Sequence, residues 1–456
     1  MRQDRIKTGD QALVRQINLA IILDQLRENA PLSRAALAEN TGLNKTTVSS
    51  LVSELIDRQL VTEIGLDNPG IGRPSVQLSL NPKAGIVVSA EVGVDFISVI
   101  STDFTPQVTY RLNMVIESNQ EQDETIDQLL VLLKNTLSEN HASSERLLGV
   151  AVGVPGLVDY ETGTLLFAPN LGWRDAQLGQ ILASRFDAPV IIDNEANLAA
   201  LGETYFGAAR GYREVLYISA GVGIGGGIIR DGSVMRGIAG FAGEFGHMTV
   251  DPLGDLCNCG NRGCWETRAS QRALFDHIYK AFAAGRKSLL QDLVHGNMKA
   301  MSIPVIVEAA QLGDELALEA IQAIGQRLGI GIASLVNAYN PELVVFGGPI
   351  SLAWEFLGPV IEEQINLRSL RWHRETTRLV RARHGADACV MGGVAAVCNQ
   401  VLVRPSGSLS NVSIPALLSN RAGNNFGKEV SSSRKTQSPL RSSAEPSNSL
   451  TTSDRR

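Results

Sequence analysis

The feature that most constrains the fold of this chain is a short segment with one histidine and three cysteines. His247, Cys257, Cys259 and Cys264 together supply the Cys₃His ligand set of a closed tetrahedral zinc site. Cys257 and Cys259 are separated by one residue and are too close to bridge each other comfortably, so a disulfide network explains the cluster less well. Because four protein ligands leave no position for water, the sequence predicts a structural Zn²⁺ rather than a catalytic one.

The predicted zinc loop also carries two acidic residues whose chemistry suits a polyhydroxylated ligand. Glu244 lies shortly before His247, and Glu266 lies shortly after Cys264. Carboxylates beside a positioned histidine can accept hydrogen bonds from the hydroxyl groups of a sugar. The alternative is that both glutamates lie at the surface and bind nothing.

Residues 1–80 have the pattern of a winged helix-turn-helix. Ala38 is small where two helices must touch, Gly42 permits a tight turn, and Val48 and Leu51 return to the core, which is the order that a tri-helical motif needs. The expected elements are a helix over 12–29, a helix capped by Ser33 and ending at Asn40, a helix from Asn44 to about Gln59, and a hairpin of Leu60–Ile64 and Ser75–Leu80.

The third predicted helix has short hydrogen-bonding side chains opposite its apolar stripe, as a helix in the major groove requires. Arg73, held between a glycine and a proline in the second limb of the hairpin, can reach a phosphate or the minor groove. The net charge of the chain is −6, so DNA contact depends on local placement of charge. The predicted DNA-binding residues are Arg34, Asn44, Lys45, Thr46, Thr47, Ser49, Ser50 and Arg73. A small helical bundle that binds a protein is the alternative.

Residues 81–402 alternate β-branched and helical segments and contain most of the glycines, which is typical of an α/β domain. Gly85–Ser101 and Glu214–Arg230 each predict a strand, a glycine-containing turn and a second strand. Such turns let backbone N–H groups approach a phosphate closely. Two similar hairpins predict two similar lobes that face a cleft, and Gly347-Gly348 is a third candidate turn at that cleft. Residues 403–456 are rich in serine and predict a disordered tail, for which phosphorylation or DNA tethering is an alternative role.

The stretch from about residue 10 to residue 400 resembles the ROK family (repressors, open reading frames, kinases), in its winged-helix repressor branch that includes the xylose repressors. The zinc motif, from Gly243-Glu244-Phe245-Gly246-His247 to Cys264-Trp265-Glu266, carries this resemblance. It implies an α/β fold of two actin-like ATPase lobes with a sugar between them, behind the winged helix-turn-helix. It places the sugar-binding positions on Asn170, Asn194, Glu195, Glu244, His247 and Glu266, so that His247 would both bind zinc and contact the sugar.

The sequence differs from the ROK kinases at the positions that would bind ATP and activate the sugar. ROK kinases carry Asp-x-Gly-Gly-Thr in the first phosphate loop, and this chain has Val94 in place of a glycine and Asp95 in place of the threonine. Glu195 replaces the aspartate that serves as general base and is one methylene longer; a misplacement of about 1 Å can cost about 100-fold in rate. We therefore expect sugar binding with no catalytic residues. The second glycine turn is closer to the kinase form and leaves nucleotide binding open.

The predicted function is a sugar-responsive, DNA-binding transcriptional regulator, namely a repressor that a small sugar (xylose or a hexose) releases from its operator. The alternatives are an active ROK-type hexose kinase, a regulator for which the sugar is a corepressor, and a repressor controlled by a partner protein. Because a single winged helix reads too few base pairs, we expect a homodimer or a dimer of dimers on duplex DNA. A cytoplasmic location without a membrane partner is expected, since no long apolar stretch is present and the first residues are charged.

Overall fold

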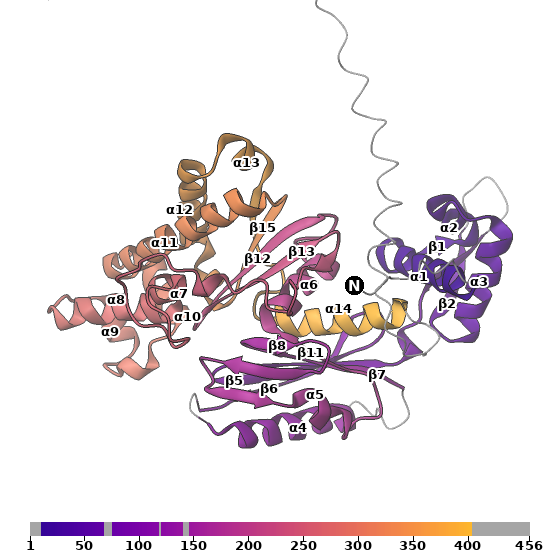
Figure 1. Ribbon diagram of the computed structural model, residues 1–456, viewed down its shortest axis with the longest axis horizontal. Coiled ribbons are helices and arrows are strands. Elements are labelled where there is room, and N and C mark those ends of the chain that lie inside the picture. Colours follow the sequence, from indigo (N-terminus) through magenta and orange to yellow (C-terminus); the bar gives the residue numbers. More distant parts are fainter. Residues whose placement is uncertain (1–10, 68–74, 118–119, 140–145, 404–456) are drawn as a thin grey trace, which may run out of the picture. The chain divides into compact units, whose positions relative to one another are not determined.

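The computed structural model describes residues 11–67, 75–117, 120–139 and 146–403 (Figure 1). Two sequence predictions lie outside these residues: the DNA contact assigned to Arg73 and, apart from its first residue, the disordered tail assigned to 403–456.

The N-terminal segment forms the three helices and the hairpin that its sequence predicts. Its elements are α1 (Gln11–Asn29), β1 (Leu32–Ser33), α2 (Arg34–Thr41), α3 (Lys45–Asp57), β2 (Val61–Asp67) and β3 (Ser75–Leu80). Ser33 caps α2 by accepting a hydrogen bond from the N–H of Ala36, and Asn44 caps α3 by accepting one from the N–H of Thr47. Gly42 ends α2 with a φ of 68°, in the left-handed region that favours glycine. The strands β2 and β3 pair antiparallel as the wing, and β1 pairs with β3.

The first lobe is built on a five-stranded sheet in the order β11-β7-β4-β5-β6. Its elements are β4 (Ile86–Val92), β5 (Phe96–Thr102), β6 (Val108–Val115), α4 (Gln122–Glu139), β7 (Leu147–Val154), β8 (Leu157–Asp159), β9 (Thr164–Ala168), β10 (Trp173–Ala176), α5 (Leu178–Ala183), β11 (Val190–Asn194) and α6 (Glu195–Phe206). Alternate side chains of β4 enter different cores: Val87 belongs to the cluster that contains the apolar residues of the C-terminal helix, whereas Val88 belongs to the cluster that contains α4. Both faces of this sheet are therefore covered, which explains why β4 is almost continuously apolar.

The second lobe repeats the plan with a sheet in the order β14-β13-β12-β15-β16. Its elements are β12 (Glu214–Ala220), β13 (Ile224–Arg230), β14 (Ser233–Val234), α7 (Trp265–Ala269), α8 (Gln271–Ala283), α9 (Leu289–Leu293), α10 (Ile303–Gln311), α11 (Glu315–Tyr339), β15 (Leu343–Gly347), α12 (Trp354–Arg368), α13 (Arg371–Thr376), β16 (Arg378–Arg381) and the C-terminal helix α14 (Ala388–Val403). In each lobe the central strand is β4 or β12. The two pairings on one side of it are antiparallel, and the two on the other side are parallel. The prediction of two similar lobes is confirmed at the level of topology.

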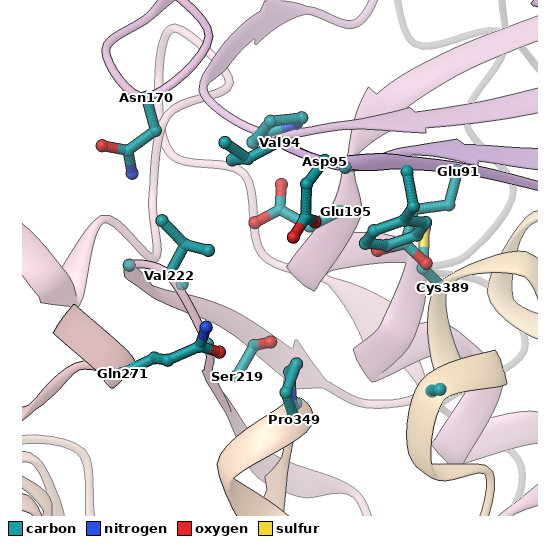
Figure 2. Close-up of a pocket in the computed structure, with 18 of the residues that line it drawn as sticks. Glu91, Val94, Asp95, Asn170, Glu195, Ser219, Val222, Gln271, Pro349 and Cys389 are labelled. Carbon is teal, nitrogen blue, oxygen red and sulfur yellow. The ribbon is translucent and has the colours of Figure 1, made fainter. Parts of the chain in front are cut away.

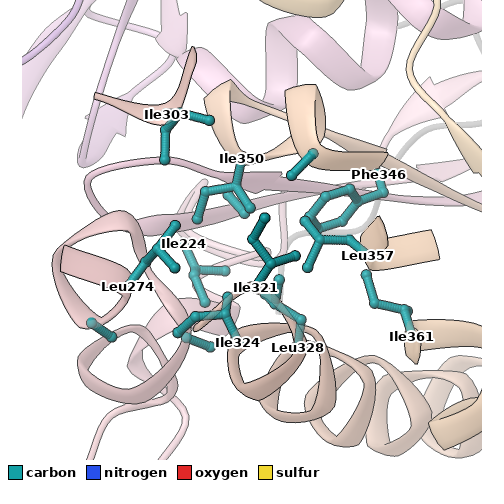
Figure 3. Packing of buried hydrophobic residues seen from close by; sticks show 14 of the residues in the cluster. Ile224, Leu274, Ile303, Ile321, Ile324, Leu328, Phe346, Ile350, Leu357 and Ile361 are labelled. Carbon is teal, nitrogen blue, oxygen red and sulfur yellow. The ribbon is translucent and has the colours of Figure 1, made fainter. Parts of the chain in front are cut away.

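The core of the second lobe lies between its sheet and the helices α8, α10, α11 and α12. Figure 3 shows Ile224 and Phe346 of the sheet region in contact with a layer of isoleucine and leucine side chains from these helices. Ile321, Ile324 and Leu328 recur at helical spacing along α11 and are fully buried. This cluster holds the turn of β12 and β13 firmly against the helices that follow the zinc motif.

Two helices cross where the lobes meet. Alanines of α6 pack with strand residues of the second sheet, while Val390 and Val394 of α14 pack with the first. The crossing is close because Gly202 of α6 and Gly392 of α14 face each other, and a Cβ atom built on Gly202 would lie 2.7 Å from the backbone nitrogen of Gly392. The apolar stretch Gly385–Leu402 passes a test of length and hydropathy for a membrane span, but 67% of it is buried inside the protein, as suits a core helix.

Candidate functional site

A cavity of about 660 Å³ lies between the lobes, and it is lined by the turns at the ends of both central hairpins. The lining includes all six residues that the sequence assigned to sugar binding. Figure 2 shows Asn170 and Glu195 reaching into this cavity from the first lobe, opposite Val222 and Gln271 of the second lobe. The residues that were far apart in the sequence are therefore brought to one site.

The four predicted metal ligands converge at one edge of the cavity. One ligand atom from each of His247, Cys257, Cys259 and Cys264 lies within 4.8 Å of the other three. The Nδ1 atom of His247 lies 3.7 Å from the Sγ atom of Cys257, and the Sγ atoms of Cys259 and Cys264 are also 3.7 Å apart. All five cysteines of the chain are free of disulfides. The donor set and its convergence fit a four-coordinate zinc ion with no open position.

Glu266 connects the metal cluster to the cavity. It lies in the first turn of α7, two residues after Cys264, and is 8% exposed. One carboxylate oxygen accepts a hydrogen bond of 3.0 Å from the thiol of Cys257, and the other accepts one of 3.4 Å from the N–H of Ile224 in β13. The metal cluster and the second-lobe hairpin therefore fix this carboxylate from two sides.

Glu244, His247 and Asn170 complete this side of the cavity. The Nε2 atom of His247 lies 3.8 Å from a carboxylate oxygen of Glu244, and the Nδ1 atom lies 3.8 Å from Glu266. The Asn170 side chain accepts a hydrogen bond of 3.0 Å from Asn258, a residue of the cysteine loop. Two carboxylates, one side-chain amide and one imidazole thus face one space, which suits a ligand with several hydroxyl groups.

The structure separates the roles of Asn194 and Glu195, which are neighbours in the sequence. The Asn194 oxygen caps α6 by accepting from the N–H groups of Ala196 and Asn197, and its amide donates to the carbonyl of Gly156 at 3.0 Å. Asn194 therefore mainly holds the local backbone, which its position in the sequence did not reveal. In contrast, the Oε2 atom of Glu195 is buried with no hydrogen-bond partner in the described protein. Burial, followed by the charge of Glu244, raises the pKa of Glu195 well above its usual range.

An arginine that sequence reasoning missed joins the two lobes beside these residues. Arg236 follows β14 of the second lobe and donates to Asp193 at the end of β11 in the first lobe, with N–O distances of 2.8 and 2.7 Å. Its guanidinium carbon lies 3.6 Å from the ring centroid of Tyr160. Asp193 directly precedes Asn194, so this paired charge fixes one lobe's sugar-side segment to the other lobe. No pattern in the sequence connects residues 193 and 236, because the pairing exists only across the cavity.

The part of the cavity that would face ATP phosphates in a kinase is lined by acidic and apolar side chains. Figure 2 shows Val94, Asp95 and Glu91 along the turn of β4 and β5, with Cys389 beside Glu91. A Cβ atom on Gly93 would lie 2.2 Å from the ring of Phe96, so this turn is covered by its own side chain. Burial raises the pKa of Glu91 to about 7, against a hydrogen bond from Cys389 that lowers it. Arg111 is the cation on this side of the described lining, and it is paired with Asp387.

The predicted DNA-contacting face of α3 is exposed in the structure. Lys45, Thr46, Ser49 and Ser50 are exposed, and Thr47 is half-buried, while Val48 on the opposite side is fully buried. Arg34 is half-buried and its guanidinium pairs with Glu63 of β2 at 3.0 Å, so it also ties α2 to the wing. Asn44 uses its side-chain oxygen as the cap of α3, which leaves its amide group for DNA.

Comparisons with known proteins agree with this geometry. The ROK family matches residues 87–400, and a winged helix-turn-helix DNA-binding family matches residues 21–62. The xylose repressor of Bacillus subtilis is 36% identical over 394 residues, which are 86% of this chain and 98% of that protein. A crystal structure of a ROK family transcriptional regulator, homologous to the Escherichia coli MLC protein, is similar with a TM-score of 0.74 and 31% identity over 86% of this chain and 97% of that one.

A kinase of known structure is also similar. A ROK family glucokinase from Streptomyces griseus, in complex with glucose and AMPPNP, has a TM-score of 0.62 and 29% identity, and it covers 69% of this chain and 100% of its own. The transcriptional regulator covers 86% of this chain, against 69% for the glucokinase. The chain therefore belongs to the ROK family, with a winged helix-turn-helix ahead of two actin-like lobes.

Proposed function

We propose that this protein is a DNA-binding repressor that a small sugar releases from its operator. The proposal rests on a difference between two sides of one cavity. On the side of the predicted sugar-binding residues, carboxylates and an imidazole converge. On the side that would face ATP phosphates in a kinase, Val94, Asp95 and the Phe96 ring line the cavity. An exposed polar α3 on the same chain supplies the surface for the major groove. The name of the Bacillus subtilis relative makes D-xylose the first sugar to test.

The proposal assigns residues 1–80 to DNA binding and residues 81–402 to sugar sensing. Asn170, Asn194, Glu195, Glu244, His247 and Glu266 would line the sugar. His247, Cys257, Cys259 and Cys264 would hold one structural zinc ion, whose chemistry is to fix the loop between Glu244 and Glu266. A homodimer in the cytoplasm would place two winged helices on two half-sites of the operator.

The first experiment measures sugar binding and DNA binding in the full chain. A thermal-shift screen with D-xylose, D-glucose and other aldoses identifies the sugar, since a ligand at 100 times its Kd adds about 2.7 kcal/mol of apparent stability. Fluorescence anisotropy with a duplex selected from a random-sequence pool then measures DNA affinity with and without that sugar. We expect the sugar to weaken DNA binding. Equal DNA affinity at saturating sugar would contradict the proposal.

Two variants assign the sites. Lys45→Ala should weaken DNA binding and flatten its dependence on salt, because one phosphate contact is lost, whereas Lys83→Ala outside α3 should do neither. Glu244→Ala should keep DNA affinity without sugar and lose the response to sugar. A Lys45→Ala variant with unchanged affinity and salt slope would place the DNA surface elsewhere.

An active sugar kinase is the second candidate, and the turn of β12 and β13 favours it because Gly221 and Gly223 carry no side chains of their own there. A coupled assay with ATP and the same sugars separates the two candidates. Turnover on the order of 1 per second, as in typical kinases, would support the kinase.

A further inference from the structure

Helix α6 is in contact with both proposed sites. Its first residue, Glu195, lines the cavity and has a buried carboxylate oxygen without a hydrogen-bond partner among the described residues, and Asn194 caps the same end. Its last residues, Tyr205 and Phe206, contact the winged helix-turn-helix through α1. A helix of 12 residues spans about 18 Å, so a single rigid element extends from the cavity to the DNA-binding segment.

The contact at the far end of α6 is specific rather than a chance apposition. The guanidinium group of Arg27 in α1 lies over the ring of Tyr205, 4.6 Å from its centroid, and donates to the Tyr205 carbonyl at 3.4 Å. Asp24 and Glu28 hold the same guanidinium at 2.7 and 2.9 Å. The Arg27 side chain is only 12% exposed, so the cation is fixed from several sides and its stacking is stronger than at an open surface.

The rest of α6 is held so that a displacement at one end reaches the other. Glu203 is fully buried and accepts hydrogen bonds from the N–H groups of Ala208, Arg383 and His384. Gly202 and Gly392 bring α6 and α14 into backbone contact, and a Cβ atom on Gly392 would lie 1.7 Å from the Leu198 carbonyl oxygen. Tightly packed helices with this geometry slide or rotate as units and do not bend.

The chain connection between the two regions is tied to the winged helix-turn-helix. The Asn81 amide donates to the Gln59 carbonyl at 2.7 Å, and the Asn81 N–H donates to the Leu60 carbonyl at 3.0 Å. Ala84, two residues after Pro82, is buried. Because this connection is hydrogen-bonded to the winged helix-turn-helix, we expect it to move with that segment and not to respond by itself to a ligand in the cavity.

We propose that Tyr205 and Arg27 are positioning residues that transmit sugar occupancy from α6 to the winged helix-turn-helix. A sugar that hydrogen-bonds to Glu195 and draws the lobes together displaces α6 against α14. The Tyr205–Arg27 contact then transmits that displacement to α1. This changes the distance between the two α3 helices that would bind the two half-sites of the operator. This inference rests on the proposed function and adds the route of its regulation.

The test uses the full-length protein with D-xylose, or D-glucose if only that sugar binds, and the duplex selected by the wild type. The variants are Tyr205→Leu and Arg27→Met, which keep apolar bulk but remove the ring and the cation. Tyr212→Leu is the matched control, because Tyr212 is also half-buried but packs with the second-lobe sheet. Pro82→Ala tests the covalent connection. Zinc content and melting temperature are measured for each variant.

For the wild type, we expect saturating sugar to weaken DNA binding by roughly 5- to 150-fold. Tyr205→Leu and Arg27→Met should keep the sugar Kd and the sugar-free DNA Kd within about threefold, while the response falls to about a third of the wild-type factor or less. Their double variant should add little to either alone, since both break one contact. Tyr212→Leu and Pro82→Ala should respond like the wild type.

Two results overturn the inference and remain distinguishable from each other. If Tyr205→Leu and Arg27→Met respond to sugar as the wild type does, the route through α6 is wrong while the repressor function stands. If the wild type binds none of the screened aldoses, or binds one without change in DNA affinity, the proposed function fails together with any coupling. A variant that misfolds is recognised by its melting temperature, and the other variant then decides.

Discussion

The turns of the two central hairpins occupy equivalent places in the two lobes but meet very different surroundings. In the first lobe, the turn between β4 and β5 is covered by Phe96 and bears Val94 and Asp95. In the second lobe, Gly223 lies between β12 and β13, and a Cβ atom there would lie 2.7 Å from the Glu266 carboxylate and 2.9 Å from the Asn170 amide. The two lobes share one topology, but the turn of the first lobe is covered and acidic. The turn of the second lobe lies against two of the proposed sugar-binding residues.

The neighbours of the two turns differ in chemistry. The second turn must stay glycine because two polar side chains approach its backbone. At the first turn the near neighbour is apolar, because the Phe96 ring lies 2.2 Å from where a Cβ atom on Gly93 would be.

The largest effect is expected from removal of the metal ligands that support the sugar side. Cys259→Ser should abolish zinc binding and weaken sugar binding about 10- to 100-fold or more, because the loop that positions Glu266 loses its fixed geometry. Elemental analysis and calorimetry measure both quantities. Cys398→Ala, whose sulfur is buried among apolar residues far from the loop, should keep the zinc and the sugar affinity. A metal-free wild type that binds sugar normally would refute the proposed role.

Alanine substitutions in the two turns compare them directly. Gly223→Ala should lower sugar affinity about 100-fold, since its methyl group displaces the buried Glu266 carboxylate and leaves its partners unsatisfied. Gly93→Ala should leave sugar affinity unchanged, because its methyl group meets only the Phe96 ring. Calorimetric titration measures both, and equal losses would show that the first turn also belongs to the sugar site.

A smaller effect is expected from restoring the first turn. The double variant Val94→Gly and Asp95→Thr should raise the affinity for a non-hydrolysable ATP analogue by about tenfold, because a branched side chain and a negative charge leave the phosphate side. Sugar affinity should not change. If the wild type already binds the analogue as tightly as the double variant, the side chains of this turn do not exclude nucleotide.

The smallest effect concerns stability and pH. Burial raises the pKa of Glu91 from 4.5 to about 7 in the folded protein, so its contribution to stability is present below pH 4.5 and is lost as the pH rises through 7. Glu91→Gln should therefore gain a few degrees in Tm relative to the wild type between about pH 5 and pH 8, with sugar affinity unchanged. Glu117→Gln, at an exposed position, should show no such trend. A constant Tm difference across this range would exclude a buried neutral Glu91.

Much of the architecture followed from local patterns. Ser33, Gly42 and Asn44 predicted the helix boundaries of the N-terminal segment because capping and left-handed turns depend on a few adjacent residues. The duplicated hairpins predicted two similar lobes for the same reason, since strand and turn preferences are local. The cysteine spacing alone predicted that four ligands converge, which the structure confirms as geometry.

The sequence by itself determined the elements, the metal-type cluster and the residue types available to a ligand. Only the tertiary structure decided which of these groups are free: it uses Asn194 as a helix cap, pairs Arg34 with Glu63 and leaves Glu195 unpartnered. It also created the Arg236–Asp193 pair and the Arg27–Tyr205 contact, whose members are distant in sequence. The physical reason is that hydrogen-bond satisfaction and burial depend on which surfaces the packed lobes bring together, and no local preference encodes that.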